Sequence, residues 1–291
     1  MSTKLGLIAG GGALPLEIAN ACREADRPLF VVRLKGFAEP SLNAFDGIDA
    51  GLAELGKGIK ALKQAGCRAV CFAGLVRRPD FSALIPDLRG LAVLPGAILA
   101  ARRGDDALLR FMVHEFEREG FIIEGAHEVG AGLVLGEGPL GRVAPGESHR
   151  SDMVRAMEVA RAIGQMDIGQ GAVVARGLVL AVEAQEGTDA MLARCAELPI
   201  ALRGTPEAPI GVLAKAPKPI QERRVDMPTI GVATVMAAAH AGLAGIVGET
   251  GALLVVDRQA VIQRADDLGL FIVGVPHEVE DPREVEDRAD T

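Results

Sequence analysis

The sequence has no tryptophan and no tyrosine, and phenylalanine occurs only nine times in 291 residues. Proteins that bind nucleic acids usually carry an excess of basic residues and stack aromatic side chains on the bases. This chain instead has a formal net charge of -8 at neutral pH. We therefore expect no nucleic acid among its partners.

Cysteine is also scarce, with four residues in the whole chain: Cys22, Cys67, Cys71 and Cys195. So few cysteines in a chain of this length do not indicate a disulfide framework, and we expect small core residues in a reducing compartment. The chain starts with a strand-like segment and shows no charged region followed by an apolar leader, so no signal peptide is predicted. These features favour the cytoplasm.

The sequence contains one long stretch without charged residues, the 20 residues at positions 229–248. A membrane-spanning helix needs about that length of mainly apolar residues. Alanine and glycine make up half of this stretch, it contains His240, and Gly242 and Gly245 interrupt it. We predict a buried helix followed by a strand, and no membrane span.

The first 130 residues alternate between short apolar runs and segments with helical spacing. Strands are predicted at residues 5–9, 29–32, 68–73 and 121–123, and helices at 14–25, 56–65 and 105–119. This alternation favours a parallel sheet wound in βαβ units. We therefore predict a Rossmann-like nucleotide-binding domain over residues 1–130.

Residues 131–150 are rich in glycine and proline and lack a sustained period, so we place a domain junction there. A second α/β domain is predicted over residues 151–276. It begins with a helix at 151–163 that Ser151 caps, and a hairpin follows, with strands 172–175 and 178–183 joined by Arg176 and Gly177. Further strands are predicted at 210–214, 245–247, 253–256 and 270–273, and helices at 231–241 and 257–267. Residues 277–291 hold seven carboxylate side chains and two arginines, and we expect a solvated or disordered acidic tail.

Three glycines, Gly10 to Gly12, follow the first predicted strand, and Leu14 opens the next helix. Glycines there let the backbone approach a ligand closely, at the edge where open parallel sheets bind nucleotides. The NAD fingerprint is incomplete, because Pro15 stands where a third glycine is needed and basic residues, Arg33 and Lys35, follow the second strand. An NADP site and a tight turn without a ligand both remain open.

Two arginines, Arg77 and Arg78, follow the third predicted strand at the same sheet edge as the glycines. Guanidinium groups at this edge would bind a phosphate through paired hydrogen bonds. A surface ion pair would account for either arginine equally well.

Acidic and hydroxyl side chains gather at two predicted strand-to-helix turns of the second domain. Glu183, Glu186 and Asp189 surround Thr188, and Asp226 precedes the second turn. If both turns lie on one sheet edge they converge, and diphosphate hydrolysis needs such a set: carboxylates that hold Mg²⁺ or activate water, cations that neutralise charge, and donors that orient oxygens. The alternative is structural, with the threonines as helix caps and the charges in solvent.

The segment 215–231 between two apolar runs is dense in charge and proline. Lys215, Lys218, Arg223 and Arg224 precede a helix start that we expect near Thr229. Helix N-termini present unpaired N–H groups and a positive dipole end, so this segment is a predicted phosphate site. Solvated charges beside a capped helix are the alternative.

Six motifs then point to a family. They are Gly-Gly-Gly-Ala-Leu-Pro (10–15), Gly-Asp-Asp-Ala-Leu-Leu-Arg (104–110), Glu-Gly-Ala-His-Glu (124–128), Asp-Ile-Gly-Gln (167–170), Val-Glu-Ala-Gln-Glu-Gly-Thr-Asp-Ala-Met (182–191) and Lys-Pro-Ile-Gln-Glu-Arg-Arg-Val-Asp-Met-Pro-Thr-Ile-Gly (218–231). In this order they resemble the UDP-2,3-diacylglucosamine pyrophosphatases of the LpxI type, to about residue 275. The resemblance implies a cytoplasmic enzyme of lipid A biosynthesis that uses Mg²⁺ to hydrolyse UDP-2,3-diacylglucosamine to UMP and 2,3-diacylglucosamine 1-phosphate (lipid X). Water would attack the phosphorus next to the glucosamine.

The resemblance also implies a homodimer, two domains with the substrate in a cleft between them, and a transient contact with the inner face of the inner membrane. Asp226 would be the base or a metal ligand, the three glycines would cradle the UDP end, and other residues would orient the diphosphate and sugar. An NADP-linked oxidoreductase and a non-catalytic nucleotide-lipid binding protein are the alternative functions. The predicted catalytic residues are Asp226, Thr188, Asp189, Lys215, Gln170 and Asp167, and the predicted substrate-binding residues are Gly10, Gly11, Gly12, Leu14, Arg77, Arg78, Glu186, Lys218 and Thr229.

Overall fold

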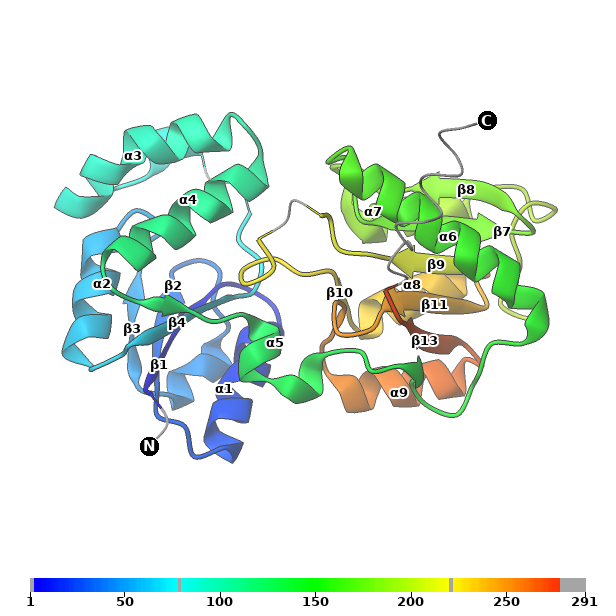
Figure 1. The fold of residues 1–291 in the computed structure, drawn as a ribbon, viewed down its shortest axis with the longest axis horizontal. Coiled ribbons are helices and arrows are strands. Elements are labelled where there is room, and N and C mark those ends of the chain that lie inside the picture. Colours follow the sequence, from blue (N-terminus) through cyan, green and yellow to red (C-terminus); the bar gives the residue numbers. More distant parts are fainter. Residues whose placement is uncertain (1–2, 78–79, 220–221, 278–291) are drawn as a thin grey trace, which may run out of the picture. The chain divides into compact units, whose positions relative to one another are not determined.

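The computed structural model describes residues 3–77, 80–219 and 222–277, which form two compact α/β units (Figure 1). The first unit consists of three segments, residues 1–134, 217–232 and 254–261. The second unit contains residues 135–216, 233–253 and the described residues from 262 onward. The predicted two-domain α/β fold is confirmed. The predicted acidic tail lies outside the described residues, apart from His277.

The first unit is built on a parallel sheet. Its strands are β1 (Leu5–Ala9), β2 (Leu29–Leu34), β3 (Gly47–Ala50), β4 (Ala69–Ala73) and β5 (Ile122–Ile123), in the order β3-β2-β1-β4-β5. Every neighbouring pair is parallel, and Leu7 in the centre lies between Val31 and Cys71. This order is that of a Rossmann-like half, as predicted. The four-residue strand β3 is not predicted from the sequence.

Helices cover both faces of this sheet because successive strand residues point to opposite sides. Leu5, Leu7 and Ala9 pack with residues of α1, whereas Ile8 packs with residues of α2 and α4. The helices of this unit are α1 (Leu14–Glu24), α2 (Leu55–Gln64), α3 (Leu88–Ala101), α4 (Asp105–Arg118) and α5 (Ala126–Val129), with the short 3₁₀ helices η1 (Pro40–Ala44), η2 (Phe81–Ala83) and η3 (Ala131–Leu133).

Two short strands complete the first unit. β10 (Thr229–Ile230) pairs in parallel with β12 (Leu254–Val255), and both come from the late segments of the chain. Met227 and Leu254 are buried in the same core cluster as Leu5 and Ala126. The first unit therefore completes its core with residues from the C-terminal half of the sequence.

The second unit is built on a mixed sheet. Its strands are β6 (Gly138–Pro139), β7 (Gly171–Ala175), β8 (Leu178–Val182), β9 (Val212–Lys215), β11 (Gly245–Glu249) and β13 (Phe271–Val275), in the order β6-β13-β11-β9-β7-β8. The three central strands are parallel, and β6, β7 and β8 pair antiparallel with their neighbours. Ala156, Met157 and Ala160 of α6 (Glu147–Gln165) pack on this sheet. The remaining helices are α7 (Gly187–Ala196), α8 (Val232–His240) and α9 (Arg258–Asp267).

The predicted hairpin of β7 and β8 is confirmed, and a buried carboxylate holds its turn. Arg176 and Gly177 have positive φ values of 50° and 77°, as a tight two-residue turn requires. Asp152 in α6 is buried, and its two carboxylate oxygens accept the N–H groups of Arg176 and Gly177 at 2.8 and 2.7 Å. The predicted cap at Ser151 is wrong, because α6 already begins at Glu147 with Gly146 as N-cap.

The cysteines and the long uncharged stretch behave as the sequence predicts. All four cysteines are buried and free of disulfides, and burial raises the pKa of the Cys71 thiol. The stretch 229–248 contains β10, α8 and the start of β11. Within the described ranges of the chain, no helix has the length and apolar character needed to cross a membrane.

Replacing Asp152 by alanine should lower the free energy of unfolding by about 1–3 kcal/mol, because two turn N–H groups lose their acceptors. Urea unfolding of the purified variant measures this difference. Glu158→Ala on the same helix is the control, since its ion pair with Arg155 is exposed and should contribute within about 0.5 kcal/mol. Equal stability losses in the two variants would contradict the assigned role of Asp152.

Candidate functional site

A series of hydrogen bonds joins three polar side chains in the second unit. Lys215 at the end of β9 is 3% exposed, and its ammonium donates to Thr188 Oγ1 at 2.7 Å. The Thr188 hydroxyl donates in turn to Glu183 Oε1 at 2.9 Å, and Glu183 is 6% exposed. One hydroxyl thus links a buried ammonium to a buried carboxylate, which offsets part of the cost of removing both from water.

The sheet topology brings these side chains together. β7 is antiparallel to β9, with Gly171 opposite Lys215. β8 returns along β7, and the Glu183 N–H just after it donates to the Gly171 carbonyl oxygen at 2.8 Å. Gly187, with a φ of 79°, then starts α7 and places Thr188 in its first turn. The structure therefore joins the predicted residues Thr188 and Lys215 through direct contact.

Two glycines leave the space that Glu183 occupies. A Cβ atom on Gly169 would lie 2.0 Å from the Glu183 carbonyl oxygen, and a Cβ atom on Gly171 would lie 2.5 Å from Glu183 Oε2. Any side chain at either position would force Glu183 to move. The sequence analysis does not identify this role. The sequence feature that could have indicated this role is the alternation of glycines in Asp-Ile-Gly-Gln-Gly (167–171), at the start of a strand.

Two buried oxygen atoms in this region, Gln170 Oε1 and Glu183 Oε2, have no hydrogen-bond partner among the described residues. Gln170 is next to the cluster, since its backbone carbonyl accepts the Ala216 N–H at 3.0 Å. An unsatisfied buried acceptor costs about 1–3 kcal/mol, so such atoms mark a place for a donor or a cation from outside the chain. Carboxylate and amide oxygens are ligands that suit Mg²⁺.

Three other predicted site residues of the second unit are exposed. Asp189 lies in the first turn of α7, and Asp167 has a φ of 56°, which an aspartate tolerates. The Glu186 carboxylate accepts a hydrogen bond from Arg194 at 2.5 Å. Hydrogen bonds from its own backbone N–H and from Arg194 lower the pKa of Glu186. Glu186 is thus ionised and paired at neutral pH.

The glycine turn of the first unit packs against the segment that follows β4. Gly11 and Leu75 exchange backbone hydrogen bonds of 2.9 Å each, and a Cβ atom on Gly10 would lie 2.8 Å from the Leu75 carbonyl oxygen. Gly12 has a φ of 83° and open space where a side chain would be. Leu14 opens α1, whose N-terminus has no side-chain cap; Pro15 in its first turn has no N–H group, and the Leu16 and Glu17 N–H groups donate to the Ala13 carbonyl oxygen at 3.0 and 3.1 Å. Arg77 is exposed after β4, and the predicted Arg78 lies outside the described residues.

Asp226 belongs to the first unit and is half-buried there. Its segment is tied down two residues earlier by Arg224, whose guanidinium donates two hydrogen bonds to Glu222 and one to Glu117, each 2.8 Å long. The Glu222 N–H also donates to Asp106 at 3.1 Å. These contacts with α4 fix the backbone immediately before Asp226.

The prediction that a helix starts near Thr229 is wrong. Thr229 lies in β10, its hydroxyl donates to the Met227 carbonyl oxygen at 3.1 Å, and α8 begins only at Val232. Lys218 is half-buried in the same segment. The predicted meeting of Asp226 with Thr188 and Asp189 involves residues of both units and stays a prediction.

No group of three or more His, Cys, Asp or Glu side chains in the described residues could hold a metal ion by itself. Mg²⁺ commonly binds through one or two carboxylates together with substrate phosphates and water. The unsatisfied oxygens of Gln170 and Glu183 in the second unit are of a kind that suits Mg²⁺, and so, separately, is the carboxylate of Asp226 in the first unit.

Comparisons with known proteins cover both units. One family model, described as the LpxI N-terminal domain, matches residues 4–133, and another, the LpxI C-terminal domain, matches residues 136–273. A relative from Caulobacter vibrioides, described as UDP-2,3-diacylglucosamine pyrophosphatase LpxI, is 65% identical over 281 residues. The matched region is 97% of this chain and 99% of the relative.

The contact between Glu222 and Arg224 should depend on pH. Hydrogen bonds from Arg224, which outweigh the opposite effect of burial, lower the pKa of Glu222. This contact therefore stabilises the folded chain fully above the unfolded pKa of about 4.3, and that stabilisation is lost as the pH falls through the lower folded value. Glu222→Gln should accordingly be less stable than the native chain at neutral pH, with a difference that shrinks in acid.

Carbon NMR titration of the Glu222 carboxyl group measures its pKa and so tests whether Arg224 lowers it. In Arg224→Gln, the pKa of Glu222 should rise towards its ordinary value. Glu147→Gln serves as the control for stability, because the pair of Glu147 with Arg150 is exposed and 3.5 Å long. An unchanged Glu222 titration in Arg224→Gln would rule out this anchoring contact.

Proposed function

The chain belongs to the LpxI family, and from this membership we propose that it hydrolyses the diphosphate bond of UDP-2,3-diacylglucosamine in lipid A biosynthesis. The products would be UMP and 2,3-diacylglucosamine 1-phosphate. The observation that carries the proposal is the 65% identity, over 97% of the chain, to a relative with that printed activity. The buried Lys215 beside Thr188 supports it, because a diphosphate needs a fixed cation.

In the proposed reaction, water attacks the phosphorus next to the glucosamine. A new P–O bond forms, the bond from this phosphorus to the bridging oxygen breaks, and UMP leaves with that oxygen. The proton of the attacking water passes to a base. Asp226 is proposed for one of two tasks, accepting this proton or holding Mg²⁺ together with diphosphate oxygens. When bound, Mg²⁺ would neutralise charge on the phosphoryl oxygens.

The second unit would supply a positive charge and oriented donors. Lys215 keeps its ammonium in a dry setting, where its attraction for a phosphoryl oxygen is stronger than in water. The Thr188 hydroxyl donates to Glu183 and accepts from Lys215, so it positions the ammonium. Gln170, Asp189 and Asp167 are proposed to orient the diphosphate and the sugar. The glycine turn and Arg77 of the first unit are proposed for the UDP end.

Further parts of the proposal concern the assembly and the location of the protein. We propose a homodimer in the cytoplasm whose protomers contact the inner membrane transiently, where a diacylated substrate resides. α3 supports the membrane contact, because its exposed side chains include Leu88, Leu91 and Leu99. Sedimentation of the purified protein with and without lipid vesicles measures both the dimer and the contact.

Incubation of the purified protein with UDP-2,3-diacylglucosamine and Mg²⁺ should release UMP and the lipid monophosphate. In ¹⁸O-labelled water, the label should enter the lipid monophosphate, because the phosphorus next to the glucosamine is attacked. Asp226→Ala should lower kcat by about 10²–10⁴-fold, while Glu207→Ala, at an exposed loop position, should stay near native. Substrate binding without turnover would favour a carrier protein, and an NADPH-dependent absorbance change would favour an oxidoreductase.

A Mg²⁺ titration separates the two tasks of Asp226. Asp226→Asn keeps an oxygen ligand but loses the base. If Asp226 holds the metal, higher Mg²⁺ should restore part of the activity of Asp226→Asn; if Asp226 is the base, the loss should be the same at every Mg²⁺ concentration. Full activity of Asp226→Ala would remove this residue from the mechanism.

Glu183→Gln should lower kcat by about 10–100-fold with little change in KM, because Glu183 positions the Lys215 ammonium through Thr188. Glu197→Gln, an exposed position after α7, is the matched control. Glu183→Asp, which keeps the carboxylate, should recover part of this activity; an equal loss of kcat in Glu183→Asp and Glu183→Gln would contradict the positioning role.

A further inference from the structure

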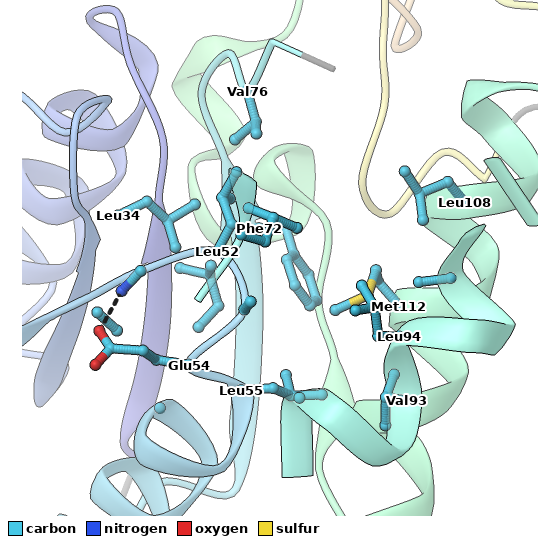
Figure 2. A pocket seen from close by; sticks show the side chains of 18 of the residues that line it. Leu34, Leu52, Glu54, Leu55, Phe72, Val76, Val93, Leu94, Leu108 and Met112 are labelled. Atoms are coloured by element: carbon cyan, nitrogen blue, oxygen red, sulfur yellow. Dashed lines mark hydrogen bonds between the residues drawn. The ribbon is translucent and has the colours of Figure 1, made fainter. Parts of the chain in front are cut away.

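A cavity of about 310 Å³ lies at the carboxyl ends of the parallel strands of the first unit (Figure 2). One wall is formed by residues from the strands and the turns that follow them, including Leu34 and Phe72. The opposite wall is formed by residues of α3 and α4, including Val93, Leu108 and Met112, whose side chains face the strands in Figure 2. Ligands of open parallel sheets bind at this edge.

The lining is almost entirely apolar. Among the described residues that line the cavity, charge is confined to Glu54, Arg77 and Asp105, and the last two are exposed. The Glu54 carboxylate accepts the Gly51 N–H at 2.6 Å, as drawn in Figure 2, and the Lys35 ammonium at 3.1 Å. Its hydrogen-bonding capacity is therefore directed to the chain itself. A bound molecule would meet hydrocarbon over most of the surface that the protein presents to it.

The size of the cavity exceeds what core packing leaves by chance. Protein interiors are close-packed and hold few voids larger than one water molecule. Pockets that bind small molecules start at about 300 Å³, and apolar cavities stay dry and take up apolar ligands. A nucleobase would leave its polar edge unpaired against such a lining, whereas a hydrocarbon chain has no polar group to satisfy.

The cavity is connected to the predicted polar site through one segment. Val76 and Arg77 line it, and Leu75 directly before them exchanges hydrogen bonds with Gly11 of the glycine turn. A lipid whose polar part lies at the glycine turn and Arg77 would therefore have the mouth of the cavity beside it. Arg77 lines the cavity and is exposed, and a cation beside an apolar lining suits the boundary between a charged head and an apolar tail.

We propose that this cavity binds one fatty acyl chain of the lipid substrate. The inference rests on the proposed function, since it takes a diacylated nucleotide sugar as the substrate, and it adds where one of the acyl chains is held. Each methylene group that leaves water for such a lining strengthens binding by about fourfold. The cavity would thus make the enzyme select for chain length.

Filling the cavity tests this selection. Val93→Trp places a large ring inside it, and His114→Trp places the same ring on the outer face of α4, where the His114 side chain is 69% exposed. Val93→Trp should lower kcat/KM for long-chain substrate by at least tenfold, mainly through KM, and should leave a short-chain analogue almost unaffected. His114→Trp should change neither value. Leu108→Phe on α4 gives a second, milder filling if Val93→Trp folds poorly.

A direct binding experiment keeps the inference separate from the proposed function. A medium-chain fatty acid with a diazirine at its tail is photolysed with the intact protein, and the labelled peptides are mapped by mass spectrometry. Labels in α3 and α4 that disappear in Val93→Trp would support the cavity as an acyl site even if no hydrolysis is found. Labels elsewhere, or equal losses of kcat/KM for long and short chains, would overturn it.

Discussion

The ammonium of Lys215 and the carboxylate of Glu183 are buried in one region of the second unit and are linked by the hydroxyl of Thr188. Removing one partner of such a pair leaves a buried charge uncompensated, which typically costs about 3–5 kcal/mol. The surrounding structure therefore has to hold the three side chains at hydrogen-bonding distance from one another. The antiparallel pairing of β7 with β9 does this, and Gly169 and Gly171 leave the necessary space. A positive charge that is already dry and fixed needs no reorganisation when charge develops on a phosphoryl oxygen.

The first unit offers a different chemistry at the ends of its strands. Its glycine turn presents mainly backbone N–H and carbonyl groups, and its cavity is lined mainly by apolar side chains. These two features suit the two ends of an amphiphilic molecule, with a polar group at the glycine turn and an acyl chain in an apolar space. Asp226 also belongs to this unit, where Arg224 connects its segment to α4. The proposed division of labour follows: electrostatic positioning in the second unit, and recognition of lipid and nucleotide in the first.

Local patterns predicted the elements with a clear period, such as β1, α1 and the hairpin of β7 and β8. β3 was too short for a pattern, and α3 is apolar on nearly every side, with Arg89 as its one charged residue, so it shows no clear polar face. Two serines near the start of α6, Ser148 and Ser151, resemble caps, which explains the wrong assignment to Ser151. The link from Thr188 to Glu183 and Lys215 depends on which strands pair and in which register, and no local rule gives that pairing. For the same reason, the sequence did not reveal that the Asp226 segment belongs to the first unit.

The composition of the first unit also affects how the protein is made. Met227 and Leu254 fill its core, and β10 and β12 pair within it, yet all of them come late in the chain. During synthesis, N-terminal domains generally fold as soon as they leave the ribosome. In this protein, the sheet of residues 5–123 cannot complete its core until translation has passed residue 261. Part of its apolar surface stays uncovered until then. Nascent chains of this protein would therefore be natural clients for chaperones that shield exposed hydrocarbon.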